Sequence, residues 1–286
     1  MTIWSIWKIR SWPMTTSISS LQNTRIKELR KLKDKKYRML QRQFLIEGRR
    51  FVEEALRQRA DVQTVLYTDA ALLERLPLQE VPELIQVSSE IFKDLSDTVH
   101  PQGILSCVGI PQADPDSFCQ PAGLWLYLDE IRDPGNLGTI IRSAHAFAAS
   151  GLILSKGCAD PYQDKVLRAT MGSIFKVPLL TDQTPEFLAG RIQAGGTLYL
   201  ADLADSSDLA KTQADPQSIV VIGNEAHGVN EAIRALPHRS VRIAMPGGAE
   251  SLNAAVAAAL FLYEFKGRSA QGDQADPSGE STEIQP

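Results

Sequence analysis

Apolar runs typical of buried strands alternate with helix-like segments through the second half of this 286-residue chain. The first run, LWLYL, begins at Leu124 and is apolar throughout, as expected for a strand covered on both faces. Further strands are expected at 151–154, 197–201, 218–222 and 240–243, and helices around 137–149, 163–171 and 253–265. This alternation predicts an α/β fold in which helices cover both faces of a parallel sheet.

The first half predicts a smaller α/β domain. Residues 21–60 suit helices, because Ile26, Leu29, Leu32 and Leu40 fall near helical spacing. The stretch FLIEG from Phe44 suits a short strand. Further strands are expected at 62–67, 84–87 and 104–108, and helices at 70–75 and 89–95.

Composition divides the chain into five segments. A Pro- and Gly-rich stretch at 111–123 is typical of a linker. The end of the chain is rich in Ser, Gly and Gln and is acidic, which favours disorder. We expect a disordered N-terminal extension at 1–19, with Met14 as initiator, and a first folded domain at 20–110. A linker at 111–123, a second folded domain at 124–267 and a disordered tail at 268–286 follow.

Charge is unevenly distributed along the chain. The formal net charge is −4, yet residues 21–60 carry thirteen basic and five acidic residues, a surplus of eight. Such a segment indicates contact with RNA phosphates, although a solvated helix face remains the alternative. The predicted RNA-binding residues are Arg25, Lys27, Arg30, Lys33, Lys35 and Lys36.

Several classes of protein are disfavoured. No apolar run approaches the roughly 18 residues that a membrane-spanning helix needs. Cys107, Cys119 and Cys158 are too far apart to suggest a metal site and are odd in number, so we predict no metal and reduced thiols in a cytoplasmic protein.

Three segments carry polar residues at the end of an expected strand. The first, LDEIRDPGNLGTIIR, holds Asn136 and Arg142; the second, IVVIGNEAHGV, holds Gly223, Asn224 and Glu225. The third, IAMPGGAESLNAAV, holds Met245, Pro246, Leu252 and Asn253. Ligand sites of open α/β sheets lie at such strand ends. Taken singly, each segment also suits a bland alternative, namely a capped helix, an ordinary turn or a buried helix.

In this order, the three segments resemble the SpoU or TrmH family of SPOUT-class RNA methyltransferases. The resemblance covers 124–265, and the pattern NTRIKELRKL…FLIEG resembles the family's ribosomal-protein-like (L30e-like) substrate-binding domain. It implies a C-terminal trefoil knot, a homodimer with the active site near the subunit interface, and S-adenosylmethionine bound by the knot loops. The cofactor-binding positions that match are Gly223, Asn224, Met245, Pro246 and Leu252, and the catalytic ones are Asn136, Arg142, Glu225 and Asn253. The sequence departs from the pattern at Ala226–His227 and at MPGGAES.

The resemblance implies methyl transfer to a ribose 2′-hydroxyl, in ribosomal RNA rather than transfer RNA. It gives Arg142 a role in handling the proton, but a guanidinium with a pKa above about 12 is a poor base. We expect Arg142 to fix a substrate phosphate and stabilise the developing alkoxide, while His227 is a rival base. Two other functions stay open. An oxidoreductase is disfavoured because no G-x-G-x-x-G follows the first strand; a non-catalytic RNA-binding protein is disfavoured by the intact polar set.

Overall fold

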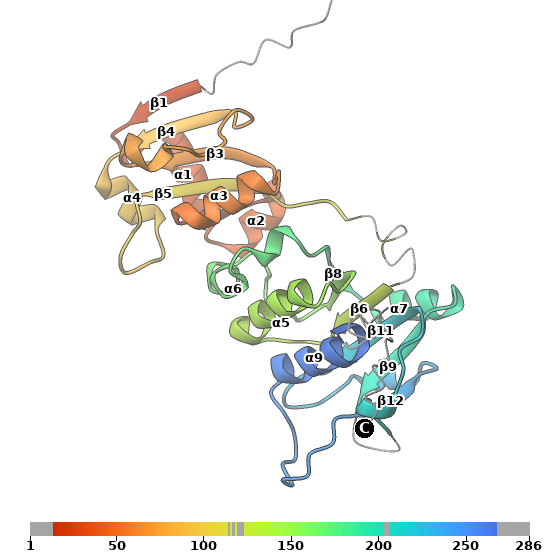
Figure 1. Ribbon diagram of the computed structural model, residues 1–286. Helices are drawn as coiled ribbons and strands as arrows, with labels where there is room; N and C mark the ends of the chain where they lie inside the picture. Colours follow the sequence, from red (N-terminus) through yellow and green to blue (C-terminus); the bar gives the residue numbers. More distant parts are fainter. Residues whose placement is uncertain (1–13, 114, 116–117, 119–122, 203–205, 268–286) are drawn as a thin grey trace, which may run out of the picture. The chain divides into compact units, whose positions relative to one another are not determined.

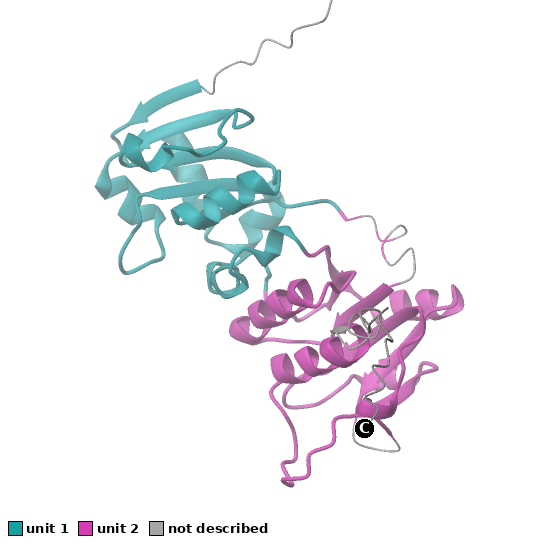
Figure 2. Cartoon of the chain, in the orientation of Figure 1, with its two compact units in different colours: residues 1–112, 160–176 teal, residues 113–159, 177–286 magenta. Residues whose placement is uncertain are grey.

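The computed structural model describes residues 14–113, 115, 118, 123–202 and 206–267. These residues form two compact units, one of 1–112 with 160–176 and the other of 113–159 with 177–286 (Figure 2). The acidic tail and residues 1–13, for which we expected disorder, lie outside the described residues. None of the described helices is both long enough and apolar enough to cross a membrane.

A five-stranded mixed sheet organises the first unit (Figure 1). Its order is β1-β4-β3-β5-β2, where β1, β4 and β3 run parallel and β5 runs antiparallel to β3 and β2. The strands are β1 (Met14–Ile18), β2 (Gln43–Glu47), β3 (Val62–Tyr67), β4 (Glu83–Val87) and β5 (Ile104–Gly109). The helices are α1 (Thr24–Lys31), α2 (Lys35–Gln41), α3 (Arg49–Arg57), α4 (Ser89–Leu95), α6 (Asp164–Thr170) and the 3₁₀ turns η1 (Ala70–Leu73) and η2 (Ser173–Phe175).

Strand β1 differs from the expectation of a disordered extension through residue 19. Met14–Ile18 pairs in parallel with β4, from Met14 opposite Glu83 to Ile18 opposite Val87. The segment MTTSI is exposed on most positions, so hydrophobic periodicity could not reveal it. Its β-branched residues suit a strand that is stabilised by backbone hydrogen bonds at the edge of a sheet.

The prediction that residues 21–60 follow one helical period was correct only as far as the end of α1. Asn23 caps α1 by accepting from the Arg25 backbone N–H at 2.8 Å, and Ile26 and Leu29 are buried. A new helix, α2, begins after the N-cap Asp34, and the helical phase is lost there. Leu40 was expected on the apolar side, but its side chain is 73% exposed, which corrects that prediction.

Residues 160–176, which the sequence placed in the second expected domain (124–267), belong to the first unit. The Arg38 guanidinium donates to the Asp160 carboxylate at 2.6 and 2.9 Å, and both side chains are buried. Tyr162 packs against Phe44 with ring centroids 4.9 Å apart. Sequence periodicity carries no information on such pairing, since Arg38 and Asp160 are 122 residues apart.

The second unit has a seven-stranded sheet that is parallel throughout, as predicted, in the order β10-β12-β9-β11-β6-β7-β8. Its strands are β6 (Gly123–Leu128), β7 (Gly151–Ser155), β8 (Leu179–Gln183), β9 (Thr197–Ala201), β10 (Ser207–Asp208), β11 (Gln217–Ile222) and β12 (Arg239–Arg242). Its helices are α5 (Pro134–Ala146), α7 (Pro185–Gln193), α8 (Glu231–Arg234), α9 (Ala254–Leu262), the 3₁₀ turn η3 (Leu209–Lys211) and the π-helical turn η4 (Tyr263–Gly267). Four of these elements, β8, α7, β10 and α8, were not predicted from the sequence.

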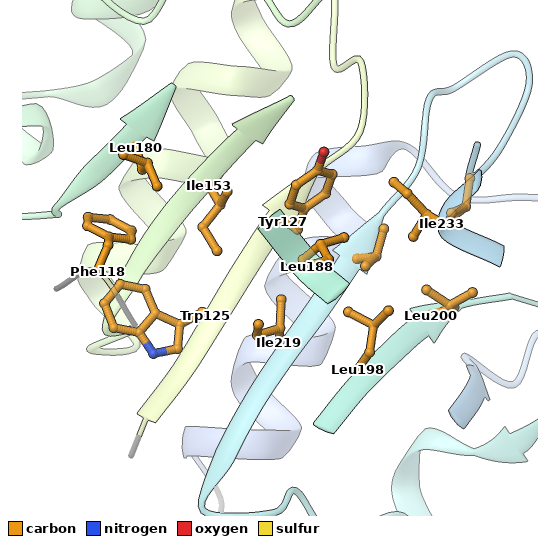
Figure 3. Close-up of a cluster of buried hydrophobic side chains, with 12 residues drawn as sticks. Phe118, Trp125, Tyr127, Ile153, Leu180, Leu188, Leu198, Leu200, Ile219 and Ile233 are labelled. Atoms are coloured by element: carbon orange, nitrogen blue, oxygen red, sulfur yellow. The ribbon is translucent and has the colours of Figure 1, made fainter. Parts of the chain in front are cut away.

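One face of this sheet forms a continuous apolar cluster (Figure 3). Tyr127, Ile153, Leu198 and Ile219 come from four strands, and each is at most 1% exposed. Phe118 also joins the cluster, with its ring centroid 4.8 Å from that of Trp125. Phe118 lies in the stretch predicted to be a linker, so part of that stretch contributes to the core; residues 114, 116–117 and 119–122 lie outside the described part.

The buried Arg38–Asp160 pair yields a test of stability. Asp160→Asn keeps the acceptor for the Tyr162 backbone N–H, which lies 2.9 Å from Asp160 Oδ1, but removes the charge. The guanidinium would then be buried without a counter-ion, and we expect the free energy of unfolding to fall by about 3–5 kcal/mol. Urea denaturation of the variant measures the change.

The matched control is Glu53→Gln, which breaks the exposed ion pair between Glu53 and Arg57 on α3. Exposed pairs of this spacing contribute about 0.3–0.5 kcal/mol. Equal effects of the two variants would contradict a special contribution from the buried pair.

Candidate functional site

The loops that follow β6 and β11 lie together at one edge of the parallel sheet. The two strands are neighbours, with Leu128 opposite Ile222, and the Asp129 backbone N–H donates to the Ile222 carbonyl at 2.9 Å. The chain proceeds from β6 towards β7, whereas β11 lies on the other side of β6. Crevices at such a reversal of strand order are the usual ligand sites of open parallel sheets.

A chain of hydrogen bonds connects three of the four predicted catalytic residues. Asn136 lies in the first turn of α5, whose N-cap Asp133 accepts from the Asn136 backbone N–H at 2.8 Å. The Asn136 side-chain amide donates to the Glu225 carboxylate at 2.7 Å. The Asn253 amide donates to the Asn136 oxygen at 2.9 Å. The three side chains thereby fix one another, although they belong to three separate segments.

Asn253 has a second task as the N-cap of α9. Its side-chain oxygen accepts from the Ala255 and Val256 backbone N–H groups at 2.9 and 3.3 Å. Such a cap contributes about 1 kcal/mol to a helix. The capping geometry leaves the amide nitrogen of Asn253 free to reach Asn136.

The loop from Gly223 to Asn230 is held by its own contacts. A Cβ atom on Gly223 would lie 2.5 Å from the Gly228 carbonyl carbon, so only glycine fits there. The Asn224 amide donates to the Glu130 carbonyl at 2.8 Å, and its oxygen accepts from the Ala226 backbone N–H at 2.8 Å. The close backbone approach that requires glycine at position 223 is therefore to the loop's own backbone.

Asp129 is a member of the site that sequence reasoning missed. Its carboxylate accepts from the Asn230 backbone N–H at 2.7 Å, which attaches the far end of the second loop to β6. Burial raises the pKa of Asp129, and the hydrogen bond from Asn230 opposes this rise. The sequence did contain a signal for Asp129, because this acidic residue directly follows an apolar strand. Glu225 has a similar position, with two residues between it and the end of β11.

A pocket of about 270 Å³ opens at the ends of β9, β11 and β12. Four predicted cofactor-binding residues line it, namely Gly223, Asn224, Met245 and Leu252, and Glu225 does so as well. Pro246, the fifth, is exposed and does not line it.

The sequence missed an ion pair that lines the same pocket. The Arg234 guanidinium pairs with the Asp202 carboxylate, which directly follows β9. Arg234 Nε also donates to the Val229 carbonyl at 3.1 Å. The pair thus joins the end of β9 to the loop after β11.

Arg142 stands apart from the hydrogen-bonded chain. It lies on α5 six residues after Asn136, a rise of about 9 Å along a helix, and it is exposed. No hydrogen bond or ion pair is recorded between Arg142 and the described residues. His227, the rival base, is also exposed.

Ion pairs engage half of the six predicted RNA-binding residues, all of which lie in the first unit. Arg25 pairs with Glu83 at 3.1 Å, and Arg30 Nε donates to Asp94 at 2.6 Å. Lys33 pairs with Asp97 at 2.8 Å. Ion pairs to the described carboxylates are not recorded for the other three, Lys27, Lys35 and Lys36.

Two family models match the chain. The model of the SpoU rRNA Methylase family matches residues 123–263. The model of the MRM3-like substrate binding domain matches residues 23–106. The two matches fall on the second and first expected domains.

Relatives cover most of the chain. The 23S rRNA (guanosine(2553)-2′-O)-methyltransferase RlmP of Bacillus subtilis is 32% identical over 87% of this chain and 99% of its own length. The mitochondrial rRNA methyltransferase 3 of Mus musculus is 31% identical over 82% of this chain and 70% of its own length. The AdoMet-bound rRNA methyltransferase of Sinorhizobium meliloti is 30% identical, with a TM-score of 0.79 over 87% of this chain and 97% of that structure. This chain belongs to the SpoU rRNA methylase family, which confirms the resemblance found in its sequence.

Proposed function

We propose that this protein transfers a methyl group from S-adenosylmethionine to a ribose 2′-hydroxyl in ribosomal RNA. The observation that carries the proposal is the hydrogen-bonded chain of Asn253, Asn136 and Glu225 beside the pocket at the strand ends. Family membership, and the relatives that are named as rRNA 2′-O-methyltransferases, support it.

The pocket suits S-adenosylmethionine in charge and in shape. The carboxylates of Glu225 and Glu250 line it together with the Arg234–Asp202 ion pair and Arg242. Charged groups of both signs suit a ligand that carries a sulfonium, an ammonium and a carboxylate group. Gly223, Met245 and Leu252 lie in loops whose backbone atoms can contact an adenine and a ribose. We include in the proposal that these loops form the trefoil knot implied by the family. When bound, the cofactor supplies an activated methyl group.

The side chains of this protein would position the nucleophile. In the reaction the methyl–sulfur bond breaks, a bond forms between the methyl carbon and the ribose oxygen, and the hydroxyl proton leaves. Arg142 holds a phosphate of the substrate and stabilises the developing alkoxide; a phosphate oxygen or water accepts the proton, because a guanidinium remains protonated. Asn136, held by Glu225 and Asn253, orients the ribose. Holding the oxygen in line with the methyl carbon lowers the barrier by several kcal/mol, on the order found for oriented reactants.

Ribosomal RNA is favoured over transfer RNA because residues 23–106 match a substrate-binding domain typical of rRNA methyltransferase 3. We also propose a cytoplasmic location, because the free thiols of Cys107 and Cys158 suit a reducing compartment. A mitochondrial location, as in the mouse relative, is the alternative.

A homodimer is part of the proposal. Val256, Leu260 and Tyr263 follow one another at helical spacing along α9 and η4, and Leu252 directly precedes the N-cap Asn253. Leu252, Val256 and Tyr263 are each at least 38% exposed. A stripe of this kind, beside the cofactor residue Leu252, is typical of a contact with a second copy. An Arg142 that is remote from the hydrogen-bonded chain of its own subunit suits a site shared between two copies.

The first prediction concerns Arg142 and tests the function itself. Labelled S-adenosylmethionine and unmodified ribosomal RNA should yield an alkali-resistant dinucleotide with the wild-type protein. Arg142→Lys keeps the charge but loses the planar fork, so we expect kcat to fall about 10²–10³-fold with cofactor affinity unchanged. Arg132→Lys, in the preceding loop, is the matched control and should leave kcat unchanged. Near-normal turnover by Arg142→Lys would exclude a need for the fork, and absence of label with every RNA would refute the enzyme.

The second prediction concerns pH. Asn136→Asp places two carboxylates at the 2.7 Å contact with Glu225, and these repel unless one takes up a proton. We expect the activity of the variant to be lowest above pH 8 and to recover partly towards pH 6, whereas the wild type does not gain activity in that direction. Asn23→Asp, at the cap of α1, is the control and should follow the wild-type profile. A variant profile parallel to that of the wild type would argue against the contact.

The third prediction concerns the dimer. Val256→Asp introduces a charge into the exposed stripe in the first turn of α9, where the helix dipole tolerates an acid. Light scattering should show the mass falling from two chains to one, with loss of methyl transfer. Val99→Asp, at an apolar residue that is 89% exposed in the first unit, should remain dimeric. A dimer that survives Val256→Asp would place the subunit interface elsewhere.

A further inference from the structure

Four exposed lysines of the first unit lie at the junction of α1 and α2. Lys27 and Lys31 are four residues apart on α1 and therefore share a face, while Lys35 and Lys36 begin α2. All four are exposed, and no ion pair to the described carboxylates is recorded for any of them. Neighbouring ammonium groups without counter-ions repel one another, and a polyanion relieves this repulsion.

An aromatic ring lies close to two of these lysines. The Lys31 ammonium is 5.5 Å from the centroid of the Tyr37 ring, and the Lys36 ammonium is 6.0 Å from it. Tyr37 is half-buried, so part of its side chain is accessible to solvent. Two acidic residues lie near these lysines in sequence. The Asp34 carboxylate caps α2 by accepting from the Lys36 backbone N–H at 2.7 Å, and the Glu28 carboxylate lies 3.7 Å from the Arg25 guanidinium.

Leu40 extends this surface with exposed apolar area. It lies three residues after Tyr37 on α2, and residues at that spacing are neighbours on a helix. Its side chain is 73% exposed, and Met39 beside it is 38% exposed. Cations, an accessible ring and an exposed leucine are the components that bind an unpaired nucleotide, since phosphates need charge and bases need a flat apolar partner.

We propose that the α1–α2 junction binds an unpaired nucleotide of the RNA substrate. Tyr37 stacks on the base, Leu40 borders it, and Lys31 and Lys36 hold the flanking phosphates. The inference rests on the proposed function for its partner, RNA, but it concerns a site in the first unit and a single-stranded element. A duplex does not use this site fully, because its bases are already stacked within the helix.

Binding of two RNA probes to the full chain tests the proposal. Fluorescence anisotropy compares a labelled oligouridine of about 12 nucleotides with a duplex of equal length. Tyr37→Ala should weaken oligouridine binding about tenfold, the size typical of one lost stack, and change duplex binding less than about twofold. Tyr37→Phe keeps the ring and should bind as the wild type does. Should Tyr37→Ala fail to fold, Tyr37→Leu removes the ring while keeping apolar bulk.

Removing the charges should act on both probes. The variant with Lys31→Ala and Lys36→Ala should weaken both complexes and lower the slope of affinity against salt by about 2. Lys93→Ala, on the exposed side of α4, is the matched loss of charge and should leave affinity unchanged.

Two results would overturn the inference, and methyl transfer separates its failure from that of the function. Oligouridine binding by Tyr37→Leu at wild-type strength excludes stacking, and an equal loss on both probes excludes the preference for an unpaired base. Methyl transfer to ribosomal RNA by a wild type whose binding ignores Tyr37 leaves the function intact and refutes only the site. Tyr37-dependent binding without methyl transfer to any RNA supports the site and refutes the proposed function.

Discussion

The parallel pairing of β6 with β11 is the constraint on which the candidate site depends. Asn136 and Glu225 are 89 residues apart in sequence, and Asn253 lies a further 28 residues along. Because the two strands are hydrogen-bonded neighbours of the same direction, the loops after them leave the sheet at the same edge. The backbone bond from Asp129 to Ile222 continues the pairing one residue beyond the strands, and the carboxylate of Asp129 then reaches Asn230. The apolar cluster that fixes the strands therefore fixes the polar site as well.

The same residues stabilise the fold and form the site. Asn253 caps α9 with its oxygen and reaches Asn136 with its nitrogen. Asp133 caps α5 and thereby holds Asn136 in the first turn of that helix. The side-chain amides of Asn253 and Asn136 each have both a donor and an acceptor engaged, so contacts within the protein rather than a ligand determine their rotamers. Pre-organisation of this kind leaves little reorganisation to be done when a substrate arrives.

The elements that depend on residues close together in sequence were predicted well. The strands from Leu124, Thr197 and Ser218 and the helix from Asn253 were placed within a few residues, because buried parallel strands form continuous apolar runs. Three of the four catalytic candidates, Asn136, Glu225 and Asn253, are joined by hydrogen bonds. Arg142 does not join them within its own chain, and its assigned role remains a prediction.

The failures have a common physical origin in contacts between distant residues. Leu40 followed the helical period, but Asp34 starts a new helix and shifts the phase. Phe118 lies in a segment with the composition of a linker, yet its ring packs against that of Trp125. The charge surplus of residues 21–60 was counted correctly, but Arg25, Arg30 and Lys33 meet carboxylates from β4, α4 and the residues after α4. Counting charge in sequence therefore overestimates the charge that is free to meet phosphate.

The route of the chain couples the stabilities of the two units. Strands β7 and β8 are neighbours in the second unit, yet the chain between them contributes 160–176 to the first. The Glu54 carboxylate on α3 forms an ion pair with the ammonium group of Lys176, the last residue of this segment, at 2.7 Å. This contact lowers the pKa of Glu54. If the first unit unfolds, the 17 residues 160–176 become a flexible loop between the paired strands β7 and β8. Pairing β7 with β8 then has to pay the conformational entropy of closing this flexible loop. When the first unit is folded, residues 160–176 are already ordered, so the first unit stabilises the second.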